Sequence, residues 1–349
     1  MSTAPIALAA PASLQLGWIR SRGFDFHFIV TSSVVALASG AIVWSHPHLI
    51  QLVLLLDLWL LGFHHVISTF TRLVFDKPSY QEHKFLVVQL PVIVLAATAA
   101  LAWGAGLWLL ATIYLYWQWF HYTRQSFGVE RMYRRKADPQ ALIHDKITHY
   151  AFYLVPLAGI VYRSWQQPKL YIGLSVWTFP IPDVVMFAVA AVAAGSFLLW
   201  LATEMRALWQ GRLAPAHFLY MLSHFTIFTI GYLLIEDVTT GWLVLNVWHN
   251  IQYIMFVWWF NNNRFKDTVD PQRPFLSKLC HSNRVLGYLG MCLVTSTVIY
   301  VLLRAGGSLA DPVPVALVSM MSINFHHYLV DGMIWKRKKA AVASSVATA

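Results

Sequence analysis

Charged residues and cysteines are scarce in this sequence. Asp, Glu, Lys and Arg together make up 11% of the 349 residues, and there are 2 cysteines. Cys280 and Cys292 show neither a paired nor a metal-binding spacing, so a disulfide framework and a cysteine-ligated metal site are not expected. Residues 1–16 lack a basic region followed by an apolar stretch and a small-residue cleavage site. We therefore expect no cleavable targeting segment.

Hydrophobic residues dominate instead, at 58% of the chain, and no fixed repeat or soluble domain is evident. Apolar runs close to the ~20 residues that a membrane-spanning helix needs recur along the chain. They predict an all-α fold, a polytopic transmembrane helix bundle of about ten spans. We expect one transmembrane helical domain over residues 1–339 and a disordered tail at 340–349. The longest connections, 165–183 and 263–284, are expected to be Pro-containing loops. The predicted spans are 24–45, 49–74, 85–103, 106–129, 148–164, 184–204, 216–235, 240–262, 285–304 and 313–335.

The basic residues indicate how the chain is oriented. The formal net charge is +10, but Lys and Arg gather in alternate loops and not on one face, so nucleic acid is not an expected partner. Arg131, Arg134 and Arg135, for example, follow the fourth predicted span. By the positive-inside rule, both termini and the loops after even-numbered spans are cytoplasmic. We therefore predict a multi-pass protein of the inner (cytoplasmic) membrane, in contact with membrane lipids.

Histidines recur inside the apolar segments. Ionisable groups within a span usually face the bundle interior and mark a site or a pathway, because hydrocarbon penalises them. Four even-numbered spans carry an aromatic residue followed by histidine, and all four run in the same direction, so the motifs can meet in one layer of the cytoplasmic half. The motifs are Phe63-His64-His65, Phe120-His121-Tyr122, Trp248-His249-Asn250 and Phe325-His326-His327-Tyr328.

Metal binding explains why histidine is the residue used. Neutral imidazole has no charge to desolvate, yet it presents a nitrogen donor to Fe, Zn, Cu or Mn. Consecutive histidines point about 100° apart on a helix, so a doublet can bridge neighbouring sites or divide into a ligand and an orienting residue. The simpler alternative, for a lone histidine such as His224 or His249, is a hydrogen bond to a neighbouring helix. The predicted metal ligands, which would suit two ions, are His64, His65, His121, His249, His326, His327 and Asp331.

Polar residues near the histidines are expected to orient the imidazoles. A metal-bound imidazole normally donates its other ring N–H to a carboxylate, an amide or a carbonyl. Asp57, Gln125 and Asn324 each lie one or two helical turns from a histidine, so we predict this role for them. His149 opens the fifth predicted span and is a possible extra ligand.

Three further residues are the predicted catalytic groups. Tyr122 follows His121 directly, and Tyr253 lies one turn after His249. Their hydroxyls are expected to form hydrogen bonds with oxygen bound at the site. Arg124 lies in the same span as Tyr122 and is expected to serve a proton path or to anchor the polar end of a substrate. Interfacial snorkelling is the ordinary role of such an arginine.

At the level of its chemistry, the chain resembles the histidine-rich integral-membrane di-iron oxygenases, which include fatty-acid desaturases and the alkane, sterol and carotenoid hydroxylases. The resemblance implies two non-haem iron ions, O2, an electron donor and a lipid or isoprenoid substrate. His144 and His149 have a desaturase-like HxxxxH spacing, but no HxxHH box is present. A looser likeness, to the Brp/Blh-type membrane β-carotene dioxygenases, covers only short stretches. These are His121-Tyr122-Thr123-Arg124 and His327-Tyr328-Leu329-Val330-Asp331.

The sequence thus predicts a membrane-bound oxidoreductase of oxygenase, hydroxylase or desaturase type. Two other classes remain open. Pairs of these histidines could be axial ligands of haem b in a quinol or electron-transfer protein. They could also relay protons or bind a cation in a coupled transporter, although neither repeated halves nor paired Gly/Pro interruptions are evident. The donor set would also accept zinc or copper in place of iron.

Overall fold

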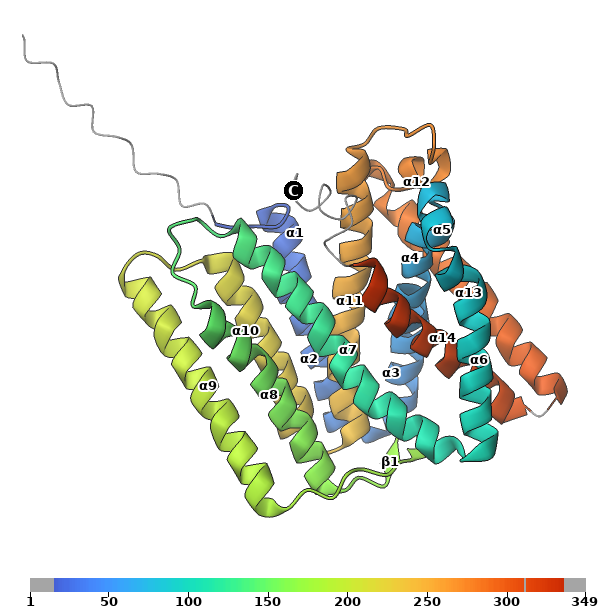
Figure 1. Cartoon of the computed structure of the whole chain (residues 1–349), viewed down its shortest axis with the longest axis horizontal. Helices are drawn as coiled ribbons and strands as arrows, with labels where there is room; N and C mark the ends of the chain where they lie inside the picture. The colour runs from blue at the N-terminus through green and yellow to red at the C-terminus, as the bar shows by residue number, and fades with distance from the viewer. Residues whose placement is uncertain (1–15, 311, 336–349) are drawn as a thin grey trace, which may run out of the picture.

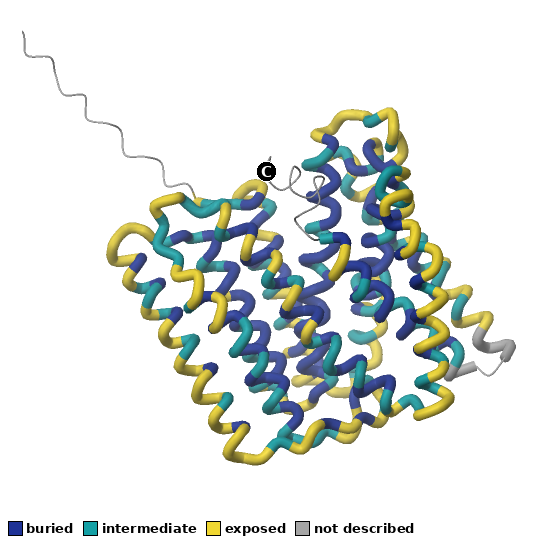
Figure 2. Tube along the Cα trace, viewed as in Figure 1, coloured by how far each residue is buried: buried dark blue, intermediate teal, exposed yellow. Residues whose placement is uncertain are grey.

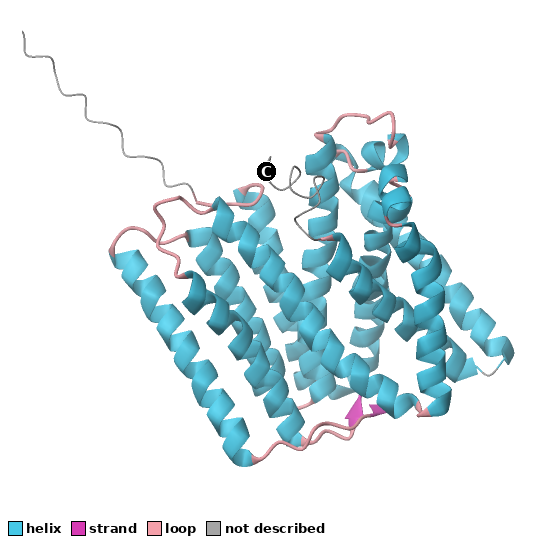
Figure 3. Cartoon of the chain, in the orientation of Figure 1, coloured by secondary structure: helices cyan, strands magenta, loops and turns pink. Residues whose placement is uncertain are grey.

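The computed structural model describes residues 16–310 and 312–335, so the predicted tail at 340–349 lies outside it. It is about 82% helical, which confirms the all-α prediction (Figure 3). Segments η1, η3 and η4 are π-helical turns that continue into α-helices at one or both ends. The helical segments are α1 (Arg22–Phe26), η1 (His27–Thr31), α2 (Ser32–Ser45), η2 (Pro47–Leu49), α3 (Ile50–Asp57), η3 (Leu58–Gly62), α4 (Phe63–Val74), α5 (Lys77–Glu82), α6 (Lys84–Gly104), α7 (Leu107–Lys136), α8 (Asp145–Gln166), α9 (Asp183–Trp209), α10 (Pro215–Thr229), η4 (Ile230–Leu234), α11 (Val238–Phe265), α12 (Pro274–Leu279), η5 (Ser282–Arg284), α13 (Val285–Ala310) and α14 (Pro312–Ile334).

Among the described residues, 6 helical stretches are long and apolar enough to cross a membrane. This is compatible with a membrane protein. The other four predicted spans also fall on helices, namely α7, α8, α11 and α14, which carry more polar residues. The 6 apolar stretches are Arg22–Ser45, Pro47–Val74, Lys84–Gly104, Asp183–Trp209, Pro215–Leu234 and Ser282–Gly306.

Helix α11 forms the centre of the bundle. It contacts α2, α4, α7 and α10, and nearly all of its residues are buried (Figure 2). In Figure 1 it stands between α8, α9 and α10 on one side and α6, α13 and α14 on the other, and α7 crosses obliquely between the two sides. A helix that is covered on every side has no solvent-facing surface for its polar residues. The polar side chains of α11 therefore face the interior of the protein.

Two glycines allow η4 and α11 to approach closely. A Cβ atom at Gly241 would lie 2.0 Å from the carbonyl oxygen of Gly231. The buried guanidinium of Arg163 donates from Nη2 to that same carbonyl at 2.9 Å and from Nη1 to the carbonyl of Glu236 at 2.6 Å. It thereby satisfies carbonyls that the end of η4 leaves without helical partners. This contact fixes the start of α11.

A short hairpin closes one end of the bundle, within the predicted loop 165–183. Strands β1 (Leu170–Tyr171) and β2 (Leu174–Ser175) pair antiparallel, with Tyr171 opposite Leu174. Ile172 and Gly173 form the turn with φ of 47° and 79°, the positive values of a type I′ hairpin. Tyr171 is fully buried, and its hydroxyl donates to Oε1 of Gln118 at 2.5 Å. The hairpin thus enters the interior through Tyr171.

Candidate metal centre

Four of the predicted ligand histidines converge from four helices. His65 comes from α4, His121 from α7, His249 from α11 and His327 from α14. The ring centroid of His65 lies 4.7 Å from that of His327 and 5.4 Å from that of His249. The ring of His121 lies 5.1 Å from that of His249 and 5.2 Å from that of His327. We call these histidines, together with Asp331 of α14, the histidine cluster.

The spacing of the donor atoms suits an ion. Nε2 of His327 lies 3.1 Å from Nε2 of His65 and 3.5 Å from Oδ2 of Asp331. Donor atoms of His121, His327 and Asp331 all lie within 4.8 Å of one another. Donors bound to one ion at ~2.1 Å are separated by about 3.0–3.4 Å at tetrahedral or octahedral angles. The separations of Nε2 of His327 from His65 and from Asp331 are close to this range.

Donor atoms of the cluster lack other partners. Nε2 of His121, Nε2 of His249 and Oδ2 of Asp331 are buried, and none forms a hydrogen bond within the described residues. Leaving a buried polar atom without a partner costs about 1–3 kcal/mol. A bound ion would satisfy these atoms together, so the residues present fit a metal.

A chain of hydrogen bonds orients His327 and Asp331. Nδ1 of His327 lies 3.0 Å from Oγ1 of Thr69, which lies 2.7 Å from the hydroxyl of Tyr253. That hydroxyl donates to Oδ1 of Asp331 at 2.6 Å, and Nε1 of Trp335 approaches the same oxygen at 3.3 Å. If His327 is protonated on Nδ1, each hydrogen bond of this chain has one donor and one acceptor. Nε2 of His327 and Oδ2 of Asp331 then face the cluster with free lone pairs that can bind a metal.

Neither Thr69 nor Trp335 was among the residues predicted to orient the imidazoles. Thr69 lies four residues after His65, and Trp335 lies four residues after Asp331. Residues at this spacing share a helix face. The four-residue spacing was the sequence signal for both residues. It does not indicate which residue one turn from a proposed ligand has its hydrogen-bond partner on another helix.

The first histidine of each doublet, His64 or His326, lies outside the cluster. Nε2 of His326 lies 2.7 Å from the carbonyl oxygen of Leu86, and its ring stacks on Phe70 with centroids 5.5 Å apart. Nδ1 of His64 lies 3.3 Å from the carbonyl oxygen of Leu60, one turn earlier on the same chain. The two doublets therefore each place one imidazole in the cluster and one against a backbone carbonyl.

Among the described residues, none of the predicted orienting side chains forms a hydrogen bond with an imidazole of the cluster. Nδ2 of Asn324 donates to the carbonyl of Met320 at 2.9 Å, within its own helix. Asp57 accepts a hydrogen bond from Asn246 at 2.6 Å. Gln125 lies one turn after His121, but no hydrogen bond joins the two side chains among the described contacts. Thr69 occupies the position for which these residues were proposed.

The possible extra ligand His149 and the predicted catalytic residue Arg124 both contact residues outside the histidine cluster. His149 is exposed, and its ring lies among Phe127, Tyr150 and Tyr153. It does not reach the cluster. Arg124 is also exposed, and its Nη1 donates to the hydroxyl of Tyr153 at 3.0 Å.

The two predicted tyrosines present different parts of their side chains. The hydroxyl of Tyr253 belongs to the hydrogen-bond chain beside His327. The ring of Tyr122 lies 4.3 Å from that of His249, but its hydroxyl donates to Oδ1 of Asn246 at 2.5 Å and accepts from Trp242 at 3.2 Å. Tyr122 thus meets the cluster with its ring and directs its hydroxyl elsewhere.

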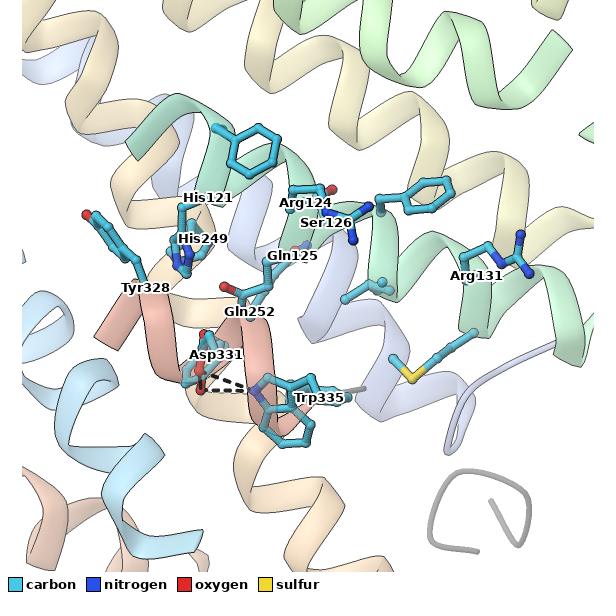
Figure 4. Close-up of a pocket in the computed structure, with 18 of the residues that line it drawn as sticks. His121, Arg124, Gln125, Ser126, Arg131, His249, Gln252, Tyr328, Asp331 and Trp335 are labelled. Carbon is cyan, nitrogen blue, oxygen red and sulfur yellow. Dashed lines mark hydrogen bonds between the residues drawn. The ribbon is translucent and has the colours of Figure 1, made fainter. Parts of the chain in front are cut away.

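A cavity of about 440 Å³ opens beside the cluster between α7, α11 and α14. His121, His249 and Asp331 lie on its wall (Figure 4). This volume falls in the usual range of ~300–1,000 Å³ for small-molecule sites. The cluster is therefore open to a ligand on one side. Its aromatic wall residues include Trp117, Phe120, Trp248, Phe256 and Tyr328.

Comparisons of the chain with protein-family models, with curated proteins and with solved structures give no match. The function is therefore argued from the site itself.

Proposed function

We propose that this chain is a membrane-embedded non-haem metalloenzyme that oxidises a hydrophobic lipid or isoprenoid substrate with O2. The proposal includes the ten-span, multi-pass arrangement in the inner membrane, with both termini cytoplasmic. The observation that carries it is the convergence of four buried imidazoles and one carboxylate, several of whose donor atoms have no other partner, on the wall of a largely apolar cavity.

The proposed ligands are the five members of the histidine cluster. These five donors are enough for one ion with an exchangeable position, and we propose one ion; the two ions implied by the resemblance would need donors from outside the cluster. Iron is proposed from the resemblance, since the donor set itself also suits zinc or copper. The ligands are His65, His121, His249, His327 and Asp331.

A bound redox-active ion would supply the activation of O2. The residues of the chain have other tasks. Thr69 and Tyr253 hold His327 and Asp331 in place, and Tyr253 is the hydroxyl hydrogen-bonded to the cluster's carboxylate. The aromatic wall excludes water from the substrate. Oxidation of a C–H bond by O2 also requires a further pair of electrons and of protons, so the proposal includes an external electron donor, which we do not identify.

The ring packing favours a bare ion over haem. Neighbouring imidazoles of the cluster lie with centroids between 4.7 and 5.4 Å apart. A macrocycle bound between two axial histidines requires a flat gap between their rings. The rings of these four pairs are in direct contact and leave no such gap.

The two doublets provide a matched test. His327→Ala removes a proposed ligand, whereas His326→Ala removes its neighbour, which is also buried but faces Leu86. We expect metal analysis of protein purified without chelators to find a transition metal in the wild type and in His326→Ala, and about a tenth or less in His327→Ala.

Three results would contradict the proposal. One is wild-type protein without transition metal. Another is equal metal content in the His326 and His327 variants. The third is an absorption spectrum with a Soret band, which would identify haem.

A further inference from the structure

Helix α7 provides one continuous wall of the cavity. Residues of α7 line it from Trp117 to Arg135, with an unbroken run at 124–129. Among them, His121, Arg124, Arg131 and Arg135 fall at the spacing of one helix face. At ~1.5 Å per residue, His121 and Arg135 are about 21 Å apart along the helix. The cavity therefore follows α7 from the histidine cluster toward the end of the helix.

Positive charge accumulates along this wall. The cavity is lined by three arginines of α7, and Asp331 is the one acidic residue among its lining residues. Figure 4 shows His121 and His249 together, with Arg124 and then Arg131 farther along α7. We call the three arginines the arginine row; its members are Arg124, Arg131 and Arg135.

Arg124 and Arg131 differ from the neighbouring Arg134 in their ion pairing. Arg134 is neutralised by the buried carboxylate of Glu130, with Nη2 and Oε1 2.6 Å apart, and by Asp145. Arg124 and Arg131 have no carboxylate partner among the described residues. Their contacts are with neutral groups: Arg124 donates to the Tyr153 hydroxyl, and the guanidinium of Arg131 lies 6.0 Å from the ring centroid of Phe127. Their charge is therefore available to an anion.

We propose that the cavity takes a single-chain amphiphile with an anionic head group, carboxylate or phosphate. The head binds at the arginine row, and the apolar chain runs along α7 between Trp117, Phe256 and Tyr328 toward His121. Guanidinium groups recognise carboxylate and phosphate through charge-assisted hydrogen bonds. This inference rests on the proposed function for what happens at the cluster, but the binding of the head group does not require the metal.

Ordinary interfacial arginines contact lipid head groups without any cavity. The distinguishing feature is that binding here is saturable and is limited to one chain per site. We therefore propose native mass spectrometry of the protein in non-ionic detergent, titrated with dodecanoate, dodecyl phosphate or dodecanol. The first two probes separate a carboxylate from a phosphate ligand, and dodecanol has the same chain without charge.

We expect at least one of the two anions to bind with a stoichiometry of one and on the order of tenfold more tightly than dodecanol, the equivalent of ~1.4 kcal/mol. Arg131→Gln and Arg124→Gln should each reduce this preference severalfold and leave dodecanol binding unchanged. Arg206→Gln, an exposed arginine of α9 outside the cavity lining, is the matched control and should change nothing.

Equal affinity for the anions and dodecanol would overturn the inference, as would an Arg206→Gln effect as large as that of Arg131→Gln. Anion binding to many sites without saturation would also overturn it, because it would identify a general interfacial surface. The same titration on metal-free protein separates the two proposals. Retained anion preference in a protein that never binds metal would refute the proposed function and leave this inference standing.

Discussion

Thr69→Val is the substitution that most directly tests how the site is held. Valine keeps nearly the same shape but removes the hydroxyl that lies 3.0 Å from Nδ1 of His327 and 2.7 Å from the Tyr253 hydroxyl. Thr69 contributes no proposed ligand. Its loss leaves the Nδ1–H of His327 without an acceptor and breaks the connection to Asp331. We therefore expect weaker metal binding although all five ligands remain.

The magnitude follows from the number of contacts that are lost. Removing a hydrogen-bond partner that orients a metal-bound imidazole typically weakens metal binding by ~10–100-fold, which corresponds to about 1.4–2.7 kcal/mol. The metal-free protein also loses stability, because a buried ring N–H without a partner costs about 1–3 kcal/mol. The two effects act on different states, so they can be measured separately.

The assay is a competition titration of the purified protein against a chelator of known affinity, with thermal unfolding recorded for the metal-free and metal-loaded forms. The control is Thr71→Val. Thr71 is equally buried on the same helix, and it bonds to the Ser68 carbonyl and lies 3.1 Å from the Tyr288 hydroxyl, away from the cluster. We expect Thr71→Val to lower the stability of both forms equally and to leave metal affinity unchanged. Equal metal affinity in the wild type and in Thr69→Val would refute the proposed orienting chain.

Two further predictions concern the scaffold. Gly241→Ala should destabilise the fold by roughly 1–3 kcal/mol or more, because its Cβ would lie 2.0 Å from the carbonyl oxygen of Gly231. The control is Gly195→Ala on α9, whose Cβ would meet nothing within 4 Å. Thermal unfolding compares the two variants, and equal melting temperatures would contradict the close packing of η4 on α11. In the loop after α11, hydrogen bonds from the hydroxyl and amide of Ser282 lower the pKa of Asp267. Because the pKa of Asp267 is lower in the folded loop than the unfolded-state pKa of about 3.9, the ionised carboxylate stabilises the folded loop at pH values above about 3.9. This stabilisation is lost as the pH falls through the folded-state pKa. The difference in amide-exchange protection of Ser282 between the wild type and Asp267→Asn should therefore shrink between about pH 5 and pH 3; a constant difference would contradict this.

The sequence was sufficient to predict the helical fold and the meeting of the aromatic-histidine motifs. It could not decide which histidine of a doublet faces inward. His64 and His65 differ by about 100° around the helix, and so do His326 and His327. The rotation of each helix about its own axis decides between them, and that rotation is set by packing against α6, α11 and α13. In α14, apolar residues surround the doublet, so no amphipathic stripe indicates the rotation. Helix α4 does have a polar stripe, but it is wide enough to include both His64 and His65.

A local irregularity explains another difference. Asp57 lies seven residues before His64, a spacing that places two residues on one stripe of a regular α-helix. The π-helical turn η3 falls between them. A π turn contains an extra residue, so the predicted stripe is interrupted, and Asp57 meets Asn246 instead. Nothing in the composition of Leu58 to Gly62 indicates a π turn. Tyr171 was likewise beyond prediction, because its burial depends on where the hairpin docks.

Two directional chains of hydrogen bonds explain why the two predicted tyrosines differ. In one, Tyr122 donates to Asn246, which donates to Asp57. In the other, Tyr253 donates to Asp331, whose second oxygen faces Nε2 of His327. Each tyrosine thus supplies a neutral donor in a chain that ends on a buried carboxylate, which reduces the cost of burying charge. Only the second carboxylate belongs to the histidine cluster. The hydroxyl of Tyr253 is therefore coupled to the proposed metal ligands, whereas that of Tyr122 ties α7 to α11 and α3.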